Sequence, residues 1–276
     1  MWVIALDIEK TGVGGKIISV GIACVDSDIK ETIEKRLIHF PRPAFPCDHR
    51  GSLFTAEAKL PQCKDDTEQM IGVFREPEGP ICDYGDFEKR CADEFWLKNP
   101  EALIANIQWN EGPLNELVAD EKEWVDEKSD MASIALVYAT VYRLCTDALE
   151  IGKDVRIVSD NPAFDIGSLD AELECLVHAY RVEQGRVDFS APQPDWRTNP
   201  CVTLNYLPRK QNRDETYDVV YTSVRDTGRY WAAMKAKLIE EVKVDDTKPH
   251  DHRADNDAEH IASFYANCVS VYPDLA

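Results

Sequence analysis

The sequence predicts an α/β fold in which a mixed sheet is flanked by helices. Two observations predict it. Short apolar segments rich in β-branched residues open the chain, and longer segments with apolar residues at steps of three and four fill much of the second half, together with one more strand-like segment. A chain of 276 residues can bury a large core. We therefore expect a single domain over residues 1–276.

Three strands are expected at the start of the chain. Residues 2–8 (WVIALDI) form a short apolar segment with an acid near its end. Residues 16–25 (KIISVGIACV) are almost continuously apolar. Residues 29–40 (IKETIEKRLIHF) loosely alternate apolar and polar side chains, as a strand with one solvent-facing side does. The connecting segments are short, so these strands are expected to form a meander.

The segment 41–128 is expected to be a large insertion after the third strand. It is rich in proline and cysteine and contains two short helical patterns. One covers residues 86–98, and the other starts at Pro100, where proline suits a first helical turn. The phenylalanine and tryptophan side chains of this segment argue for a folded insertion instead of a disordered linker.

The second half is expected to be mainly helical, with one strand at residues 154–159 (DVRIVS). The expected helices cover residues 129–151, 169–182, 225–242 and 254–271. In the third of these helices, Trp231 is expected to lie in the core. A polar, proline-containing loop is expected over residues 184–217.

The chain is strongly acidic, with 51 Asp and Glu against 31 Lys and Arg and a formal net charge of −20. This charge excludes a strongly basic nucleic-acid coat and adhesion to an anionic membrane through overall charge. It does not exclude nucleic-acid binding, which depends on local fields and bound cations. No segment has the length and apolar character of a signal peptide or a membrane span, so we expect a cytoplasmic protein with no membrane partner.

The nine cysteines form no CxxC pair. Without a secretory signal, reduced thiols are expected. A zinc site is the alternative, although the spacings lack the paired knuckles of structural zinc sites. Its candidate ligands are Cys47, His49, Cys63, Cys82 and Cys91.

Three short segments place carboxylates at the ends of expected elements. Asp7 and Glu9 lie at the end of the first strand, and the period of two directs both to the same side. Asp165 follows the strand 154–159, and Asp257 lies near the start of the last helix. Converging carboxylates repel each other, which raises a pKa, or hold a cation. Each acid also has a purely structural explanation, as a turn residue, a helix cap or a charge that complements a helix dipole.

Together, these segments resemble the DEDDh branch of the DnaQ-like (RNase T-like) 3′-5′ exonuclease superfamily. The Asp-x-Glu motif followed by Thr-Gly corresponds to DIEKTG at residues 7–12. The Asn-x-x-Phe-Asp motif corresponds to NPAFD at 161–165, and the His-x-Ala-x-x-Asp-Ala motif to HRADNDA at 252–258. Each motif alone is weakly specific, but the ordered triple is specific. The resemblance implies an RNase H-like fold and covers about residues 1–40, 130–182 and 250–271.

The resemblance also implies a two-metal site. Two Mg²⁺ or Mn²⁺ ions would be held by carboxylate oxygens, which hard divalent ions prefer. The implied ligands are Asp7, Glu9, Asp165 and Asp257. The implied general base is His252, because its spacing to Asp257 matches the third motif, whereas His250 and His260 do not match.

Substrate contacts are expected at two places. By resemblance, Thr11, Gly12 and Asn161 would contact the terminal nucleotide of a single-stranded 3′ end. A compact basic run, LPRKQNR, is a candidate phosphate-contacting edge, with a solvated charged turn as the alternative. Its cations are Arg209, Lys210 and Arg213. Many relatives of this kind form homodimers, so a homodimer is compatible with the resemblance.

Three residues depart from the family pattern. Asp160 stands where relatives often carry His, Pro162 is unusual inside the second motif, and Asp255 stands where Leu is common. None of these departures removes an implied ligand, so an active enzyme is expected.

The function expected from these observations is metal-dependent 3′-5′ hydrolysis of RNA at single-stranded 3′ ends or short overhangs. RNA is favoured because no polymerase or helicase segment accompanies the domain. The alternatives are a DNA 3′-5′ exonuclease for repair or trimming, a metal phosphohydrolase that acts on nucleotides, and a non-catalytic module whose acidic surface binds a basic partner.

Overall fold

The computed structural model describes residues 1–59, 69–109, 130–169, 171–172, 209–211, 217–219, 225–244 and 247–273. Its centre is a five-stranded mixed sheet with the order β11-β8-β1-β2-β3. The strands are β1 (Trp2–Lys10), β2 (Ile17–Asp26), β3 (Glu31–His39), β8 (Val155–Ser159) and β11 (Arg225–Asp226). β2 is antiparallel to both β1 and β3, whereas β8 is parallel to β1 and to β11.

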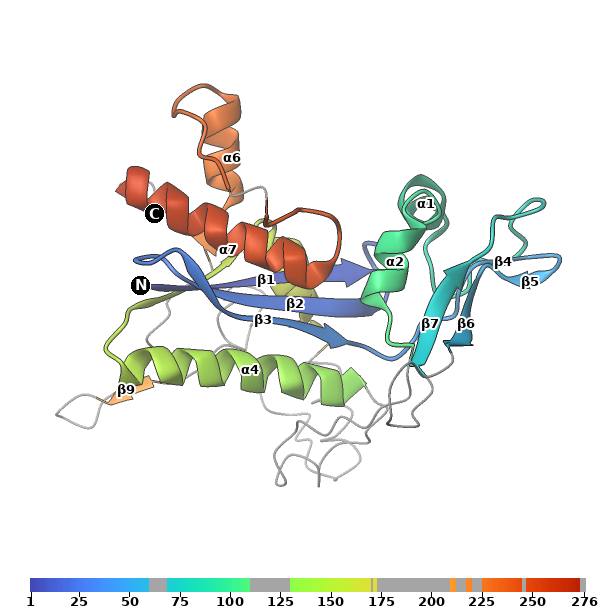
Figure 1. Ribbon diagram of the computed structural model, residues 1–276, viewed down its shortest axis with the longest axis horizontal. Helices are drawn as coiled ribbons and strands as arrows, with labels where there is room; N and C mark the ends of the chain where they lie inside the picture. Colours follow the sequence, from blue (N-terminus) through green and yellow to red (C-terminus); the bar gives the residue numbers. More distant parts are fainter. Residues whose placement is uncertain are drawn as a thin grey trace, which may run out of the picture.

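Helices cover both faces of this sheet (Figure 1). Helix α4 (Asp130–Glu150) lies along one face, and α7 (Ala254–Val271) lies along the other, where α6 (Gly228–Lys235) joins it. The mixed sheet with flanking helices confirms the predicted α/β class. The strands predicted near residues 2–8, 16–25, 29–40 and 154–159, and the helices predicted at 129–151 and 254–271, are confirmed with small shifts of their ends.

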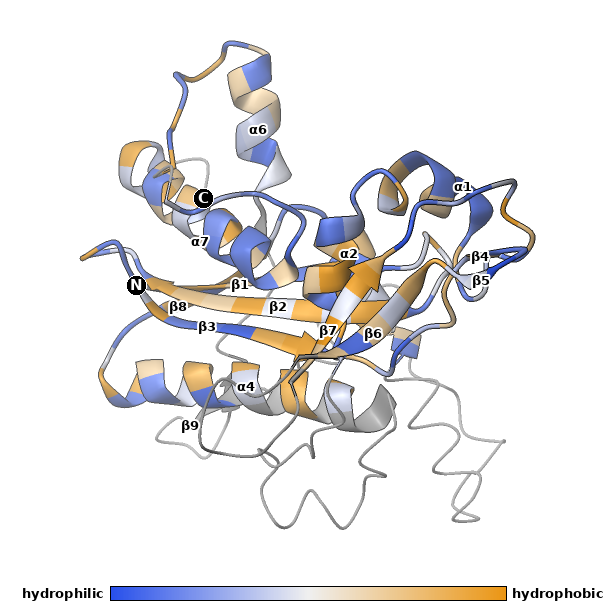
Figure 2. Cartoon of the chain, turned by 45° about the vertical axis from the view of Figure 1, so that its right-hand side comes forward, coloured by the Kyte–Doolittle hydropathy of each residue, from blue (hydrophilic) through white to orange (hydrophobic). Residues whose placement is uncertain are grey.

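Side chains of β1 alternate between the two faces because successive strand residues point to opposite sides. Ile4, Leu6 and Ile8 are buried in the cluster that includes residues of α4. Val3 and Ala5 are buried in the cluster that includes residues of α6 and α7. Figure 2 shows the apolar strands β1 and β2 between these two layers. The even-numbered positions of β1 therefore face α4, and the odd-numbered positions face α7.

The segment after β3 packs against the end of the sheet (Figure 1). Its described elements are β4 (Cys47–Asp48), β5 (Gly51–Ser52), β6 (Phe54–Lys59), β7 (Gln69–Phe74), α1 (Lys89–Cys91), η1 (Ala92–Trp96) and α2 (Pro100–Asn106). They enclose a third apolar cluster that contains Leu53, Trp96 and Leu103 and that also includes Ile18 of β2. The indole N–H of Trp96 donates a hydrogen bond to the carbonyl of Lys10, 2.9 Å away. The described part of the segment is thus folded against the sheet; residues 60–68 and 110–128 lie outside the described part.

The helix predicted over residues 225–242 is wrong at both ends. Arg225 and Asp226 form β11, and α6 ends at Lys235. Lys237 has a φ of +57°, in the left-handed region where a right-handed helix cannot continue. Trp231 is 46% exposed and stacks on Phe264 with a ring-centroid distance of 4.2 Å, so its predicted core position is wrong. The buried aromatic residue of α6 is Tyr230.

The helix predicted at 169–182 begins earlier than expected. Residues 162–169 are already helical, and Pro162 occupies the first helical position, where its fixed φ and missing N–H are tolerated. Pro162 therefore starts this helix instead of interrupting the second motif. Residues 173–182 lie outside the described part, as do most residues of the predicted loop at 184–217.

Two features considered from the sequence, a membrane span and a zinc site, can be examined in the described residues. Within the described residues, no helix has both the length and the apolar character needed to cross a membrane. In the same part of the chain, the groups able to hold a metal contain neither Cys47, His49, Cys82 nor Cys91. Cys63, the remaining candidate zinc ligand, lies outside the described residues.

Candidate metal centre

The site begins with two carboxylates on β1. Asp7 and Glu9 continue the odd-numbered face that Val3 and Ala5 present to α7. In the antiparallel pair, Asp7 lies opposite Gly21 of β2, and Glu9 lies opposite Ser19. The end of β1 thus directs both carboxylates toward the start of α7.

Gly21 lets α7 approach the sheet at this point. A Cβ atom on Gly21 would lie 1.9 Å from the carbonyl oxygen of Ala254 and 2.4 Å from the backbone nitrogen of Asp255. Only a residue without a side chain fits there. The first turn of α7 consequently lies directly over β2, and it brings Asp257 close to Glu9.

The third carboxylate comes from the connection after β8. The backbone N–H groups of Phe164 and Asp165 each donate to the carbonyl of Asn161 at 2.9 Å, which closes the first turn of the helix. Asp165 lies in that turn and is buried, and its carboxylate accepts a hydrogen bond from the hydroxyl of Ser159 at the end of β8. This hydroxyl bond ties Asp165 to the edge of the sheet.

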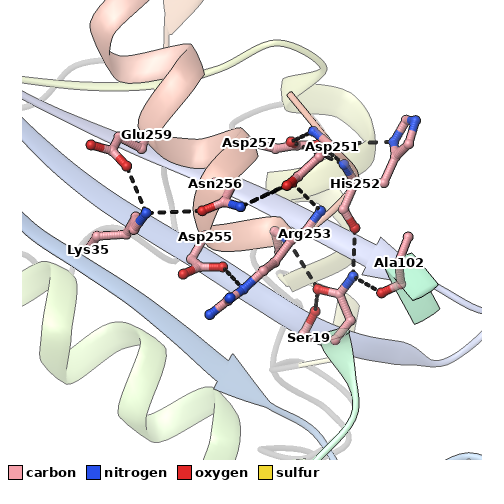
Figure 3. A network of polar contacts seen from close by, with 12 residues as sticks. Ser19, Lys35, Ala102, Asp251, His252, Arg253, Asp255, Asn256, Asp257 and Glu259 are labelled. Carbon is pink, nitrogen blue, oxygen red and sulfur yellow. Dashed lines mark hydrogen bonds and ion pairs between the residues drawn. The ribbon is translucent and has the colours of Figure 1, made fainter. Parts of the chain in front are cut away.

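The fourth carboxylate, Asp257, is held by the turn that precedes α7 (Figure 3). Its Oδ1 accepts the backbone N–H of Asp251 at 2.8 Å, and both of its oxygens lie 3.2 Å from the N–H of His252. The imidazole of His250 places Nε2 3.5 Å from Oδ2 of Asp257, and that of His252 places Nδ1 4.0 Å from the same atom. His252 has a φ of +63°, which is rare for a residue other than glycine.

These elements create two compact groups of metal-ligand atoms. One contains Glu9, His252 and Asp257. The other consists of Asp7, Asp160 and Asp165. Within each group, the ligand atoms all lie within 4.8 Å of one another. The structure therefore brings together all five residues to which sequence analysis gave a catalytic or metal-binding role.

Asp160 is the member of these groups that sequence analysis did not assign to the site. In the resemblance to DEDDh exonucleases it counts only as a departure, because that family often carries His at this position. Its location directly after β8, one residue before the turn that contains Asp165, was the available signal. A residue at the carboxyl end of a parallel strand beside β1 lies at the same sheet edge as Asp7.

The carboxylates of the site are held where their charged forms are unfavourable. Burial, followed by repulsion from Glu9 and from the acids of the other elements, raises the pKa of Asp7 well above its usual value. The pKa of Glu9 is raised in the same way, first by burial and then by Asp257. Burial raises the pKa of Asp165 to about 7, although the hydroxyl of Ser159 opposes the shift, and burial also raises that of Asp257.

The residues present fit divalent metal ions. The Oδ2 atom of Asp7 is buried and has no hydrogen-bond partner among the described residues, which is costly for a carboxylate oxygen. A cation beside it would supply the missing partner and neutralise the repulsion that raises the neighbouring pKa values. Because five of the six residues in these groups offer carboxylate oxygens, the set suits Mg²⁺ or Mn²⁺.

Thr11 and Gly12 form the turn between β1 and β2. Thr11 is fully buried, and its hydroxyl accepts the backbone N–H of Lys16 at 2.8 Å. Its own N–H donates to the carbonyl of Lys16 at 2.9 Å, and the carbonyl of Gly12 accepts the N–H of Gly15 at 3.1 Å. These bonds give both residues a structural role. Their contact with a terminal nucleotide stays a prediction.

The other predicted substrate contacts lie in different surroundings. Asn161 is exposed beside the metal-ligand groups, which leaves its side chain accessible. Arg209 and Lys210 belong to β9 (Arg209–Gln211), which pairs with β10 (Tyr217–Val219) in a separate two-stranded sheet. The side chains of Arg209 and Lys210, and all of Arg213, lie outside the described part of the structure.

Metal binding is expected to stabilise the protein more strongly at high pH. Raised folded-state pKa values mean that the folded protein binds protons more tightly than the unfolded chain does. The contribution of Asp165 to metal-free stability therefore falls as pH rises from about 4 to about 7. Mn²⁺ competes with these protons. At pH 8, Mn²⁺ at 100 times its Kd should raise Tm by about 5 °C or more, and at pH 5 it should have little effect, as measured by differential scanning fluorimetry. Equal shifts at both pH values would contradict this expectation.

The chain was compared with protein-family models, with curated proteins and with solved structures, and none of these comparisons finds a match.

Proposed function

We propose that this protein is a metal-dependent 3′-5′ exonuclease of the DEDDh type, with an RNase H-like fold, that hydrolyses single-stranded RNA from its 3′ end. One observation carries the proposal. Residues of three motifs that are far apart in the sequence form two adjacent groups of metal-ligand atoms at one sheet edge. The strand order, with β2 as the one strand of the central sheet that runs antiparallel to the other four, supports the same family assignment.

The proposed ligands are Glu9 and Asp257 on one side, and Asp7, Asp160 and Asp165 on the other. When bound, two divalent ions would acidify the attacking water and neutralise charge on the scissile phosphate. This supply of positive charge also accounts for how a chain with a net charge of −20 can bind a polyanion.

His252 is the proposed general base. Its side chain is 43% exposed beside Glu9 and Asp257, so water reaches the imidazole. In the reaction, the imidazole accepts a proton from the attacking water, whose oxygen forms a bond to the terminal phosphorus. The bond between this phosphorus and the 3′ oxygen of the preceding nucleotide breaks, and that oxygen takes up a proton from solvent. The products are a nucleoside 5′-monophosphate and a chain that is one nucleotide shorter with a 3′-hydroxyl.

The test is hydrolysis of matched 5′-labelled RNA and DNA oligonucleotides with Mg²⁺, Mn²⁺ or EDTA. The expected result is a ladder of products that shorten from the 3′ end, release of nucleoside 5′-monophosphates, faster cleavage of RNA and no cleavage with EDTA. Faster cleavage of DNA than of RNA would show that DNA is the preferred substrate. Hydrolysis confined to mononucleotides would favour a nucleotide phosphohydrolase. If neither ion supports hydrolysis, the non-catalytic acidic binding module is the function that remains.

A homodimer stays a prediction that analytical ultracentrifugation would check.

Asp160 is expected to strengthen metal binding by the group that also contains Asp7 and Asp165. Replacing Asp160 with Asn removes one negative oxygen donor and should weaken Mn²⁺ binding by about 10-fold in isothermal titration calorimetry. Asp154→Asn is the matched control, because Asp154 is an exposed aspartate immediately before the same strand. Equal Mn²⁺ affinities for the two variants would show that Asp160 is not a ligand.

A further inference from the structure

Asn106 connects the segment after β3 to the candidate metal centre. It is the last residue of α2 and is fully buried, although its position in the sequence is far from all three motifs. Its Oδ1 accepts the hydroxyl of Ser19 at 2.8 Å and the backbone N–H of Ala254 at 3.1 Å. Its Nδ2 donates to the carbonyls of Ala102 at 2.9 Å and His252 at 2.6 Å. All four hydrogen-bonding positions of the amide are thus used.

The bond to His252 acts on an unusual piece of backbone. His252 has a φ of +63°. This conformation costs free energy and persists only where the surroundings enforce it. Asn106 holds the carbonyl of this residue. Asp257 accepts its N–H (Figure 3). The imidazole packs edge-on against the ring of Phe95, with centroids 4.8 Å apart. The backbone of His252 is therefore fixed from both sides.

The same amide also fixes the strand beside the site. Ser19 lies opposite Glu9 in the β1–β2 pair, and Ala254 is the first residue of α7. Asn106 consequently sets three positions relative to one another: the strand across from Glu9, the start of the helix that carries Asp257, and the backbone of His252. Only an amide side chain can donate and accept in this pattern, because a carboxylate lacks the donors and an aliphatic group lacks both.

We propose that Asn106 is a positioning residue for His252, and that the segment after β3 thereby supports catalysis. The proposal rests on the proposed function, in which His252 takes the proton from water. Loss of the amide would free the His252 carbonyl and let the imidazole move away from the water. The N–H of Asp251 would still hold Asp257, and the pairing of β1 with β2 would still hold Glu9. Misplacement of a reacting group by about 1 Å can cost about 100-fold in rate.

The experiment compares Asn106→Leu with Ser19→Ala, which removes one bond to Asn106 but keeps the bond between Asn106 and His252. Asn106→Leu should lower kcat by about 100-fold, leave KM within about threefold and retain Mn²⁺ affinity, whereas Ser19→Ala should stay within about threefold of wild type in kcat. In a His252→Ala background, Asn106→Leu should lower kcat no further, because the side chain that it positions is absent. An equal decrease in that background, or equal effects of Asn106→Leu and Ser19→Ala, would overturn the proposal. Asn106→Ala replaces the leucine variant if that variant does not fold.

A second readout does not depend on hydrolysis. In wild-type protein, NMR should give cross-relaxation between the rings of Phe95 and His252, which pack edge-on. The Asn106 variant should lose this signal while its other core aromatic signals remain. A wild-type protein that hydrolyses nothing refutes the proposed function, and the NMR result then still decides whether Asn106 positions His252. An active wild type and an unchanged ring contact in the variant would refute the positioning role alone.

Discussion

Replacing Asp7 with Asn is expected to lower the rate of oligonucleotide hydrolysis by on the order of 1,000-fold or more and to make the metal-free protein more stable. Burial, followed by repulsion from Glu9, Asp165 and Asp257, raises the pKa of Asp7, so acids of both groups of ligands act on this carboxylate. Without its charge, neither group can hold an ion as tightly. The same charge is unfavourable in the metal-free state because Oδ2 of Asp7 is buried without a hydrogen-bond partner among the described residues. Its removal should raise the free energy of unfolding by about 1–3 kcal/mol at pH 8.

These opposite effects separate a ligand from a residue with a structural role. Hydrolysis is measured with labelled RNA in Mn²⁺, and stability by urea unfolding in EDTA. The control is Asp147→Asn, which removes an acid that is half-exposed on α4 and paired with Arg143. This control should leave hydrolysis unchanged and alter stability by no more than about 1 kcal/mol. A metal-free Asp7→Asn protein that is less stable than wild type, or that cleaves RNA at the wild-type rate, would contradict the assignment.

Replacing Gly21 with Ala is expected to damage both the fold and the site. The added Cβ would overlap the backbone of Ala254 and Asp255, and backbone atoms on a helix cannot move aside separately. The start of α7 must therefore shift away from β2. We expect the free energy of unfolding to fall by about 2–4 kcal/mol. Hydrolysis should fall by about 100-fold or more, because Asp257 and His252 move with the helix.

Gly167→Ala is the matched control for this substitution. Gly167 lies in the helix that starts at residue 162, and a Cβ atom there would have no neighbour within 4 Å. Alanine should leave stability unchanged or raise it by about 0.5–1 kcal/mol, since glycine is unfavourable inside a helix. Stability is measured by urea unfolding, and hydrolysis with the same labelled RNA. A Gly21→Ala protein with wild-type stability would show that α7 does not press on β2 as closely as the structure indicates.

The sequence was sufficient to predict the elements with clear periodicity. The apolar segments of β1, β2 and β8 and the long helices α4 and α7 have patterns that local rules recognise. The carboxylates at the ends of these elements could also be found, because sheet topology brings the carboxyl ends of β1 and β8 to one edge. The prediction for residues 225–242 was wrong at its C-terminal end because Lys237 adopts a left-handed conformation that its residue type does not reveal.

The residues that sequence analysis missed depend on contacts between distant segments. Gly21 looks like an ordinary residue of an apolar strand until α7 is packed on it. Asn106 ends a short helix in a segment without a recognised motif, and only the folded chain places it beside His252. Asp160 differs from the residue that the resemblance would lead one to expect, so a motif comparison counts it as a departure. Packing and topology, which local patterns do not contain, give these three residues their roles.

The alternation along β1 makes the placement of Asp7 and Glu9 a consequence of correct strand pairing. A slip of β1 by one residue would move Ile8 to the face that now carries Asp7 and Glu9, and it would turn these acids into the apolar cluster beneath α4. The free-energy cost of burying two unpaired carboxylates in that cluster is far larger than the free energy gained from pairing the strands. Misregistered chains are therefore eliminated by their own instability. Every folded molecule therefore directs Asp7 and Glu9 toward α7, and correct folding alone is enough to place these two carboxylates.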